Sequence, residues 1–435
     1  MEDIVCKFGG SSLAEVSQIQ RVIEIVKASD ARRFVVPSAP GKRNDDDTKI
    51  TDLLYLCQKQ GLQHLDISEP FGLIEQRFLG IVEGLDLELD MQALLDQLKT
   101  DIVAGASNDY VASRGEHLSG LILASALGAT FMDPAEGILF DADGGLDAST
   151  YLKMGELLAG SDRFVIPGFY GADPAGNVKT FSRGGSDITG AIVAKAVGAE
   201  VYENWTDVSG MLMADPRIVP DATPVKEITY REIRELAYMG ASVFHDEAMF
   251  PVRDADIPVN IRNTNRPDDP GTLILSSRAQ TDQVLVGVAG RSNFSMLFIE
   301  KALMNQTKGF GRRVLDVIEG LDISYEHTPS GIDSMSVIIS DEELGDKGER
   351  MLSEITSALH PDRVSLTPGL ALIATVGEGM SHRVGMSARL FTALAEAEVN
   401  VRVIDQGASE INIIVGVEAA DFEKAVEAIY RAFEN

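Results

Sequence analysis

The last third of the chain contains an internal repeat, and this repeat limits the folds that it can adopt. Residues 309–339 align without a gap with residues 385–415, at an offset of 76 positions, so that Gly309 matches Gly385. Each copy reads as a strand, a helix with apolar spacing and two strands separated by a glycine-containing loop, and a further helix follows each copy. This pattern predicts a duplicated, ferredoxin-like βαββα unit. Half a sheet has exposed edges, so the two copies are expected to pair. The repeat fits a ligand-binding role or a purely structural role in dimerisation.

The part of the chain before the repeat has a different organisation. Apolar segments that read as strands alternate with segments of helical spacing, which predicts a mostly parallel sheet covered by helices on both faces. We therefore expect a three-layer α/β/α domain. The strands are expected at residues 4–8, 34–36, 163–167, 200–204, 257–261 and 272–275.

Composition excludes several classes of function. The 435 residues carry a formal net charge of −29, which argues against nucleic acid or an anionic membrane as a partner. No apolar run approaches the length of a membrane span. The chain has two cysteines and begins with acidic residues, which favours a reducing cytoplasmic location. The six histidines have no ligand spacing, so a metal site built on histidine is not expected.

A glycine-rich segment, Ser182-Arg183-Gly184-Gly185-Ser186-Asp187, opens a helix-like run. The glycines allow a ligand to approach the backbone, and the free N–H groups of a helix start form an anion site. Arg183 adds a planar fork suited to a carboxylate or a phosphate. Asp187 is placed to hold a lysine beside these donors. A glycine turn that only caps the helix is the alternative interpretation.

Two further residues are candidates for this chemistry. Lys7 ends an apolar strand just before Gly9 and Gly10, and would project beyond the carboxyl end of the strand, where open α/β sheets bind ligands. The residues match neither a P-loop nor a Rossmann motif. A solvated strand-end lysine is the alternative. Glu116, expected just before a helix over residues 118–127, is either an acceptor for an ammonium group or a solvated helix-start glutamate.

Three motifs in order resemble the aspartate kinases of the amino-acid kinase superfamily. They are K-F-G-G-S-S at residues 7–12, S-R-G-G-S-D at residues 182–187, and W-T-D-V-S-G at residues 205–210 followed by D-P-R at residues 215–217. The repeat resembles the tandem ACT domains of that family, which bind amino-acid effectors. The resemblance implies a catalytic domain over residues 1–280 and ACT units over residues 281–366 and 367–435.

The resemblance also implies a reaction and a set of site residues. The family phosphorylates the aspartate side chain with Mg-ATP to give 4-phospho-L-aspartate, the first step of lysine, threonine and methionine biosynthesis. The implied catalytic residues are Lys7 and Asp187, with Mg²⁺ carried by ATP. The implied substrate-binding residues are Ser38, Thr48, Glu116, Arg183, Gly185 and Ser186. The implied ATP-binding residues are Lys7, Gly9, Gly10, Ser11, Thr206, Asp207, Asp215 and Arg217.

The chain departs from the family pattern at two places in the nucleotide site. Ser242 stands where many members carry a lysine, and the Tyr-Thr pair often found before the aspartate of D-P-R is missing before Asp215. Both departures concern contacts to ATP and not the chemistry. Two other functions stay open at this point, namely another carboxylate kinase of the same superfamily and a catalytically silent amino-acid sensor.

The effector site is predicted in one of the two repeats. Candidate residues are Asn305, Glu326, Ser330 and Asp333 in the first, and Gln406, Ser409 and Asn412 in the second. Acidic Glu326 and Asp333 favour lysine as the inhibitor, with threonine as the alternative. The paired units also predict a homodimer or a larger assembly, as is usual in this family.

Overall fold

The computed structural model describes residues 3–182, 184–241, 244, 248–278, 284–381 and 383–434. These residues form two compact units. The first comprises Met1–Met211, Pro224–Tyr230 and Val243–Arg278, and the second comprises Leu212–Thr223, Arg231–Ser242 and Ala279–Asn435. Two short segments from the first two thirds of the chain thus belong to the second unit, which the sequence did not indicate.

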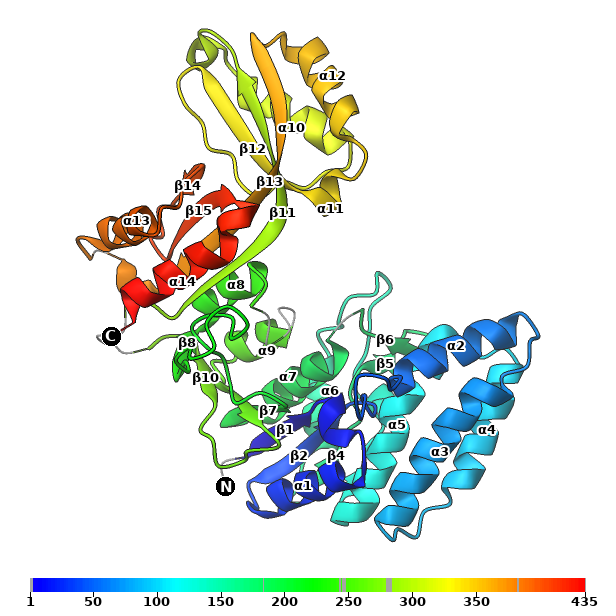
Figure 1. Ribbon diagram of the computed structural model, residues 1–435. Coiled ribbons are helices and arrows are strands. Elements are labelled where there is room, and N and C mark those ends of the chain that lie inside the picture. The colour runs from blue at the N-terminus through cyan, green and yellow to red at the C-terminus, as the bar shows by residue number, and fades with distance from the viewer. Residues whose placement is uncertain are drawn as a thin grey trace. The chain divides into compact units, whose positions relative to one another are not determined.

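The first unit is built on an eight-stranded sheet with the strand order β3-β4-β2-β1-β7-β9-β10-β8 (Figure 1). Neighbouring strands are parallel except β9 and β10, which are antiparallel, so the predicted mostly parallel sheet is confirmed. Strand β1 lies between β2 and β7, and its carboxyl end is therefore a topological switch point. The strands are β1 (Ile4–Phe8), β2 (Arg32–Pro37), β3 (Thr130–Phe131), β4 (Phe164–Val165), β7 (Val201–Thr206), β8 (Glu227–Thr229), β9 (Val259–Asn263) and β10 (Thr272–Leu275), with a separate hairpin of β5 (Tyr170–Ala172) and β6 (Val178–Thr180).

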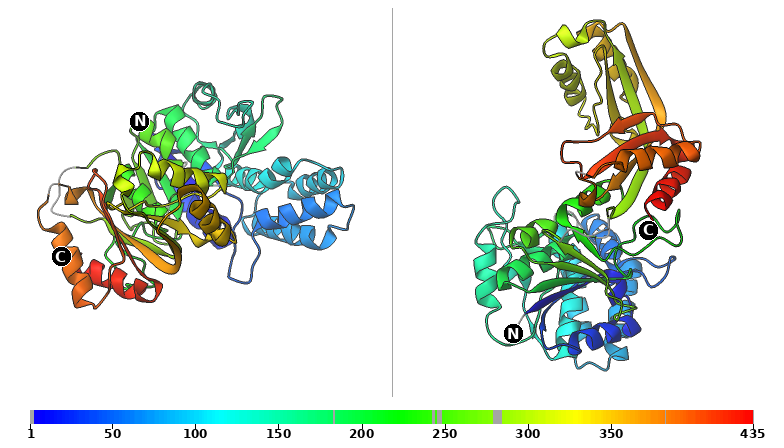
Figure 2. Two further views of the ribbon diagram at one scale, coloured as in Figure 1. Left: turned by 90° about the horizontal axis from the view of Figure 1, so that it is seen from above. Right: turned by 90° about the vertical axis from the view of Figure 1, so that its left-hand side faces the viewer.

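Helices cover both faces of this sheet, which confirms the three-layer arrangement (Figure 2). Alternation along β1 places Cys6 and Phe8 on one face, where they share a core with helices α1 (Val16–Lys27) and α5 (Asn108–Leu127). Lys7 points to the other face, toward helix α7 (Gly185–Val197). The remaining helices of this unit are α2 (Ile50–Leu62), α3 (Ser68–Gly84) and α4 (Met91–Val103), which pack near α5, and α6 (Thr150–Leu157) and α9 (Met249–Asp254), which pack against α7.

Helix α5 begins earlier than expected, so the expected position of Glu116 before a helix is wrong. The hydroxyl of Ser107 accepts a hydrogen bond from the N–H of Tyr110 at 3.2 Å and caps the helix. Gly115 lies within the helix. A glycine is needed there because Ala39 packs so closely that an added Cβ would lie 2.7 Å from the Ala39 side chain. Glu116 is consequently in the middle of α5 and buried.

The second unit contains a five-stranded antiparallel sheet with the order β12-β11-β13-β15-β14. Strands β11 (Gly287–Glu300) and β13 (Arg363–Val376), of 14 residues each, pair with each other and join the two repeats in one sheet. After helix α10 (Phe310–Gly320), the first repeat has one regular strand, β12 (Ser334–Ser340), where two strands were expected. In place of the first of these two strands there are only isolated bridges, from His327 and Ser330. The other elements are β12 (Ser334–Ser340), β14 (Val403–Asp405), β15 (Asn412–Glu418), α8 (Tyr230–Tyr238), α10 (Phe310–Gly320), α11 (Asp341–Leu344), α12 (Gly348–Leu359), α13 (Met386–Glu396) and α14 (Phe422–Phe433).

The domain boundaries that the sequence suggested remain proposals. Residues 279–283, which contain the first boundary, lie outside the described residues, and strand β13 runs across the second boundary at 366–367. Within the part of the chain that the structure describes, no helix has the length and apolarity needed to cross a membrane.

Candidate active site

A lysine and an aspartate form an ion pair at the carboxyl end of β1. Nζ of Lys7 lies 2.6 Å from Oδ1 of Asp187 in the first turn of α7. The two side chains are only 11% and 17% exposed, so their interaction is less screened than that of a surface pair. The prediction that Asp187 holds a lysine is confirmed, and Lys7 is not a solvated strand-end residue.

An asparagine on the adjacent strand contacts both members of this pair. The register of β1 and β7 places Lys7 opposite Asn204. Nδ2 of Asn204 donates to Oδ1 of Asp187 at 2.9 Å, and Oδ1 of Asn204 accepts from Nζ of Lys7 at 3.4 Å. Sequence reasoning missed Asn204, although a polar residue inside an expected buried strand was a signal that could have pointed to it.

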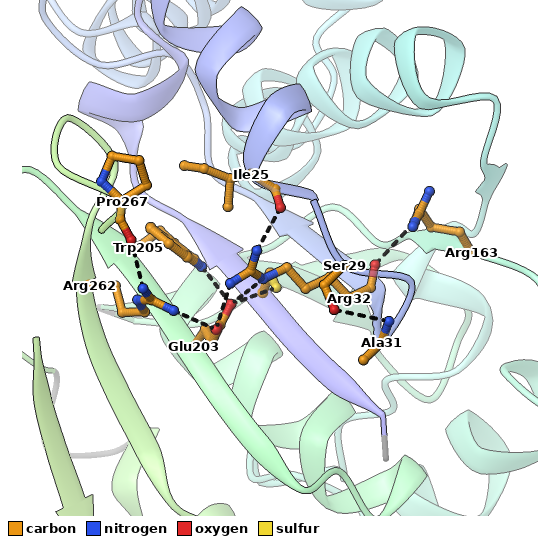
Figure 3. A network of polar contacts seen from close by, with 10 residues as sticks. Ile25, Ser29, Ala31, Arg32, Arg163, Glu203, Trp205, Arg262 and Pro267 are labelled. Atoms are coloured by element: carbon orange, nitrogen blue, oxygen red, sulfur yellow. Dashed lines mark hydrogen bonds and ion pairs between the residues drawn. The ribbon is translucent and has the colours of Figure 1, made fainter. Parts of the chain in front are cut away.

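The opposite face of β7 carries a buried carboxylate between two arginines (Figure 3). Oε2 of Glu203 accepts from Arg32 at 2.8 Å, from Trp205 at 3.0 Å and from the Cys6 thiol at 3.3 Å, and Oε1 accepts from Arg32 and from Arg262, both at 3.1 Å. Burial acts to raise the pKa of Glu203, but the guanidinium groups outweigh it and the pKa is lowered. The network ties β1, β2, β7 and β9 together behind Lys7, and Trp205, which is fully buried, packs within it.

The glycine turn after β1 packs against a neighbouring loop by direct backbone contact. The N–H of Gly41 donates to the carbonyl of Gly10 at 2.8 Å, and a Cβ on Gly41 would lie 2.7 Å from the Gly10 carbonyl carbon. The N–H of Gly9 donates to the carbonyl of Trp205 at 3.0 Å. This hydrogen bond ties the turn at Gly9 to the end of β7. Ser11 follows Gly10 within the short 3₁₀ turn at Gly10–Leu13.

An arginine on α3 anchors the loop that carries Ser38 and Thr48. The guanidinium of Arg77 donates to the carbonyl of Gly41 at 2.9 Å and lies 2.5 Å from the Asp47 carboxylate. Hydrogen bonds from Arg43 and the charge of Arg77 outweigh burial and lower the pKa of Asp47 far below its usual range. The N–H of Ser38 donates to the carbonyl of Phe8 at 3.1 Å, so this residue is placed at the end of β1, whereas Thr48 is exposed. No sequence pattern indicated the anchoring role of Arg77.

Glu116 is a buried carboxylate with an unused oxygen. Burial raises the pKa of Glu116 to about 8, although a backbone hydrogen bond from Ala39 acts to lower it. Among the described residues, its Oε2 atom has no hydrogen-bond partner. A buried acceptor without a partner is costly unless a donor is supplied, and the ammonium group of an amino acid is such a donor.

The start of α7 is packed too tightly to admit a side chain at Gly185. A Cβ on Gly185 would lie 2.6 Å from the ring of Phe169, and Phe169 itself has a φ of 81°, which is rare for a residue with a side chain. Ser186 is buried against Gly168. Gly185 thus allows the loop at residues 168–169 to lie against the helix start. Arg183 lies outside the described residues.

The predicted nucleotide residues fall into two groups. Thr206 is the last residue of β7 and Asp207 follows it, and the Thr206 hydroxyl donates to the Asp207 carboxylate at 3.2 Å. Asp215 and Arg217 belong to the second unit, where the guanidinium of Arg217 lies 2.5 Å from the Asp215 carboxylate and lowers the pKa of Asp215. Ser242 lies outside the described residues.

Most of the predicted effector residues make local contacts or are exposed. Around Asp333, the N–H of Leu303 donates to its carboxylate at 2.9 Å, and the N–H of Asn305 donates to the carbonyl of Ile332 at 3.1 Å. The Ser330 hydroxyl donates to the carbonyl of Thr328, and Gln406 and Ser409 are exposed.

Two other effector candidates contact or lie near helix α8. Glu326 accepts a hydrogen bond from the Tyr238 hydroxyl and lies 3.3 Å from the guanidinium of Arg291. Asn412 donates to Glu235 at 2.6 Å. These two residues therefore link the repeats to α8 in the structure.

Two family models match the chain. The amino acid kinase family model matches residues 3–263, and an ACT domain model matches residues 373–433. The mostly parallel sheet with a buried lysine–aspartate pair at its switch point is thus the catalytic part of a kinase of the amino acid kinase class, joined to ACT-type regulatory elements.

Individual relatives define the class more narrowly. Aspartokinase 3 of Bacillus subtilis is 40% identical over 445 residues, covering 99% of this chain and 98% of its own. The crystal structure of Clostridium acetobutylicum aspartate kinase, an allosteric enzyme, is 49% identical, with a TM-score of 0.93 and full coverage of both chains. Escherichia coli aspartokinase III, solved with aspartate and ADP in its R-state, is 27% identical with a TM-score of 0.76, and its T-state complex with lysine and aspartate has a TM-score of 0.77. The chain belongs to the monofunctional aspartate kinases (EC 2.7.2.4), which are allosterically regulated enzymes of aspartate-family amino-acid biosynthesis. The predicted aspartate kinase is therefore confirmed.

Proposed function

We propose that the enzyme transfers the γ-phosphoryl group of Mg-ATP to the side-chain carboxylate of L-aspartate, giving 4-phospho-L-aspartate and ADP. The observation that carries this proposal is the buried pair of Lys7 and Asp187, with Nζ and Oδ1 2.6 Å apart at the switch point of the sheet. The E. coli relative, solved with aspartate and ADP, supports the choice of substrates.

The chemistry requires no general base. The nucleophile is a carboxylate with an ordinary pKa of about 3.9, which is already ionised at neutral pH. The barrier comes from bringing this anion onto a polyanionic phosphate. Catalysis then consists of positioning the reactants and stabilising charge on the transferred group.

Lys7 supplies positive charge to this reaction. Its ammonium neutralises charge on the β- and γ-phosphates as the bond to the γ-phosphorus breaks, while Asp187 fixes the direction of the lysine side chain. Among the described residues there is no cluster of three or more His, Cys, Asp or Glu side chains that could hold a metal. We propose that Mg²⁺ enters as part of the Mg-ATP substrate.

The remaining site residues bind the two substrates. Glu116 accepts the ammonium group of aspartate with its unpaired Oε2, and Arg183 binds the α-carboxylate. The other proposed substrate contacts are Ser38, Thr48, Gly185 and Ser186. Besides Lys7, the proposed nucleotide contacts are Gly9, Gly10, Ser11, Thr206, Asp207, Asp215 and Arg217.

The test is ATP-dependent formation of aspartyl hydroxamate in the presence of hydroxylamine. The wild-type enzyme is expected to form product with aspartate and not with glutamate. Lys7→Ala should lower kcat by about a thousandfold or more while aspartate binding, measured by calorimetry, survives. Product with glutamate alone would overturn the substrate assignment, and full activity of Lys7→Ala would remove Lys7 from the mechanism.

We further propose that the ACT repeats bind an inhibitory amino acid, with lysine as the ligand, and that they mediate a homodimer. The acidic side chains of Glu326 and Asp333 suit a cationic effector, and the E. coli relative was solved with lysine. Strand β14 lies at an edge of the sheet, and unpaired edges favour association. Inhibition by threonine alone would reject lysine, and a monomeric mass in sedimentation would reject the dimer.

A further inference from the structure

We infer that Asn204 is a positioning residue for the phosphoryl transfer, which acts by holding the ammonium group of Lys7 and the carboxylate of Asp187 in one fixed arrangement. This inference rests on the proposed role of Lys7. Asn204 lies on β7 directly opposite Lys7 on β1, and only 3% of it is exposed. Its amide is therefore set by the strand backbone and is shielded from water.

The three side chains form a closed triangle. Lys7 donates to Asp187 Oδ1 at 2.6 Å and to Asn204 Oδ1 at 3.4 Å, and Asn204 Nδ2 donates to the same Oδ1 atom of Asp187 at 2.9 Å. Reversing the amide would place its NH₂ group against the ammonium and its carbonyl against the carboxylate. Both contacts would be repulsive, so the orientation of Asn204 is determined by its two charged neighbours.

This arrangement divides the three N–H bonds of the lysine ammonium. One is directed to the carboxylate and one to the amide oxygen, which leaves the third for an incoming phosphate oxygen. An aliphatic side chain at position 204 would leave Asp187 as the sole partner of Lys7 in the triangle. The ammonium would then be free to rotate about that single contact, and its alignment in the transition state would be lost.

A double-mutant cycle tests whether Asn204 acts through Lys7. Asn204→Leu, of similar size, is expected to lower kcat about tenfold to a hundredfold while the KM for aspartate changes less than threefold. In the Lys7→Ala background the same substitution should change kcat by less than about twofold, because the ammonium group that Asn204 positions is absent. An equal loss in both backgrounds, or an unchanged kcat in Asn204→Leu alone, would overturn the inference.

Two further variants provide a second test and a control. Asn204→Asp keeps the size of the side chain but places a second carboxylate beside Asp187, and it is expected to lose kcat even if Asn204→Leu does not fold. Tyr202→Phe is the matched control: it lies on the same face of β7 and removes a hydrogen bond to the backbone carbonyl of Asp187 at 3.2 Å. Its kcat should stay within about twofold of the wild type. Wild-type activity in Asn204→Asp would contradict the inference, and a Lys7→Ala variant of full activity would instead remove the proposed function of Lys7 on which it rests.

Discussion

Glu116 illustrates how a single residue can be prepared for a ligand at a cost to the protein. Its carboxylate is buried, one oxygen is unpaired among the described residues, and its pKa is raised to about 8 by burial. Without substrate, the side chain is therefore mostly protonated at pH 7. The ammonium group of aspartate favours the ionised form, so binding should release a proton.

We predict that aspartate binds more tightly as the pH rises from 6.5 to 8.5. Calorimetry in buffers of different ionisation enthalpy measures both the affinity and the proton release. Glu116→Gln should weaken binding about tenfold or more and abolish the proton release, because an amide cannot provide the charge. The exposed Glu83→Gln on α3 is the control. A pH-independent affinity in the wild type would contradict the proposed role.

The raised pKa of Glu116 also determines how this residue makes stability depend on pH. The pKa of Glu116 is higher in the folded protein than in an unfolded chain, so the folded state binds the proton more tightly. This contribution is fully present below the unfolded pKa, near 4.5, and is lost as the pH rises through about 8. Without substrate, Glu116→Gln should therefore unfold at a higher temperature than the wild type at pH 8.5, by a margin that shrinks toward pH 5.

At the scale of elements, the Glu203 network joins four strands of the first unit through one carboxylate (Figure 3). Glu203→Gln would leave the partly buried guanidinium groups of Arg32 and Arg262 without a counter-charge. We expect a loss of about 3 to 5 kcal/mol in the free energy of unfolding, measured in urea. The exposed Glu227→Gln on β8 should change it by less than about 0.5 kcal/mol. Equal stability of both variants would show that the network does not hold the strands.

The pH dependence of this network has the opposite sign to that of Glu116. The pKa of Glu203 is lowered in the folded protein because the arginines outweigh burial. Its contribution is present above the unfolded pKa and is lost as the pH falls through the folded value. Wild-type protein should thus lose stability in acid more steeply than Glu203→Gln.

The elements could be predicted to the extent that their signals are local. Apolar runs identified β1 and β10 with their observed bounds. Helix α5 was placed ten residues too late because its first half is polar, and its cap at Ser107 was not recognised. Asn204 and Arg77 were missed for another reason: their partners come from distant segments, and no local pattern reports such contacts.

At the scale of the whole molecule, the second unit includes helix α8, which lies within the proposed catalytic range of the sequence. Glu232 accepts from the N–H of Glu378 at 2.7 Å, Glu235 from Asn412 at 2.6 Å, and Tyr238 donates to Glu326. Three successive turns of α8 are thus tied to the ACT repeats, one of them through a proposed effector residue. An effector that binds Glu326 would have to compete with Tyr238.

We predict that Tyr238→Phe increases sensitivity to the effector. Removing the Tyr238 hydroxyl leaves a carboxylate oxygen of Glu326 available to the effector. The lysine concentration for half-inhibition should therefore fall about threefold to tenfold. The measurement is a lysine titration of the hydroxamate assay. Tyr325→Phe, at the exposed neighbour of Glu326, is the control and should not change it. Unaltered or weakened inhibition in Tyr238→Phe would contradict the competition.

The assignment of residues 212–223 and 231–242 to the second unit bears on protein engineering. A chimera or a truncation cut near residue 280 assumes that the regulatory part begins there and needs no residue from before the cut. Such a cut would leave behind Met213 and Leu236, which pack around Gly287, and Thr223, whose N–H donates to the Tyr430 hydroxyl at 3.0 Å. A chimera that exchanges effector specificity must therefore include residues 212–223 and 231–242, so that the transferred regulatory part keeps its own packing contacts.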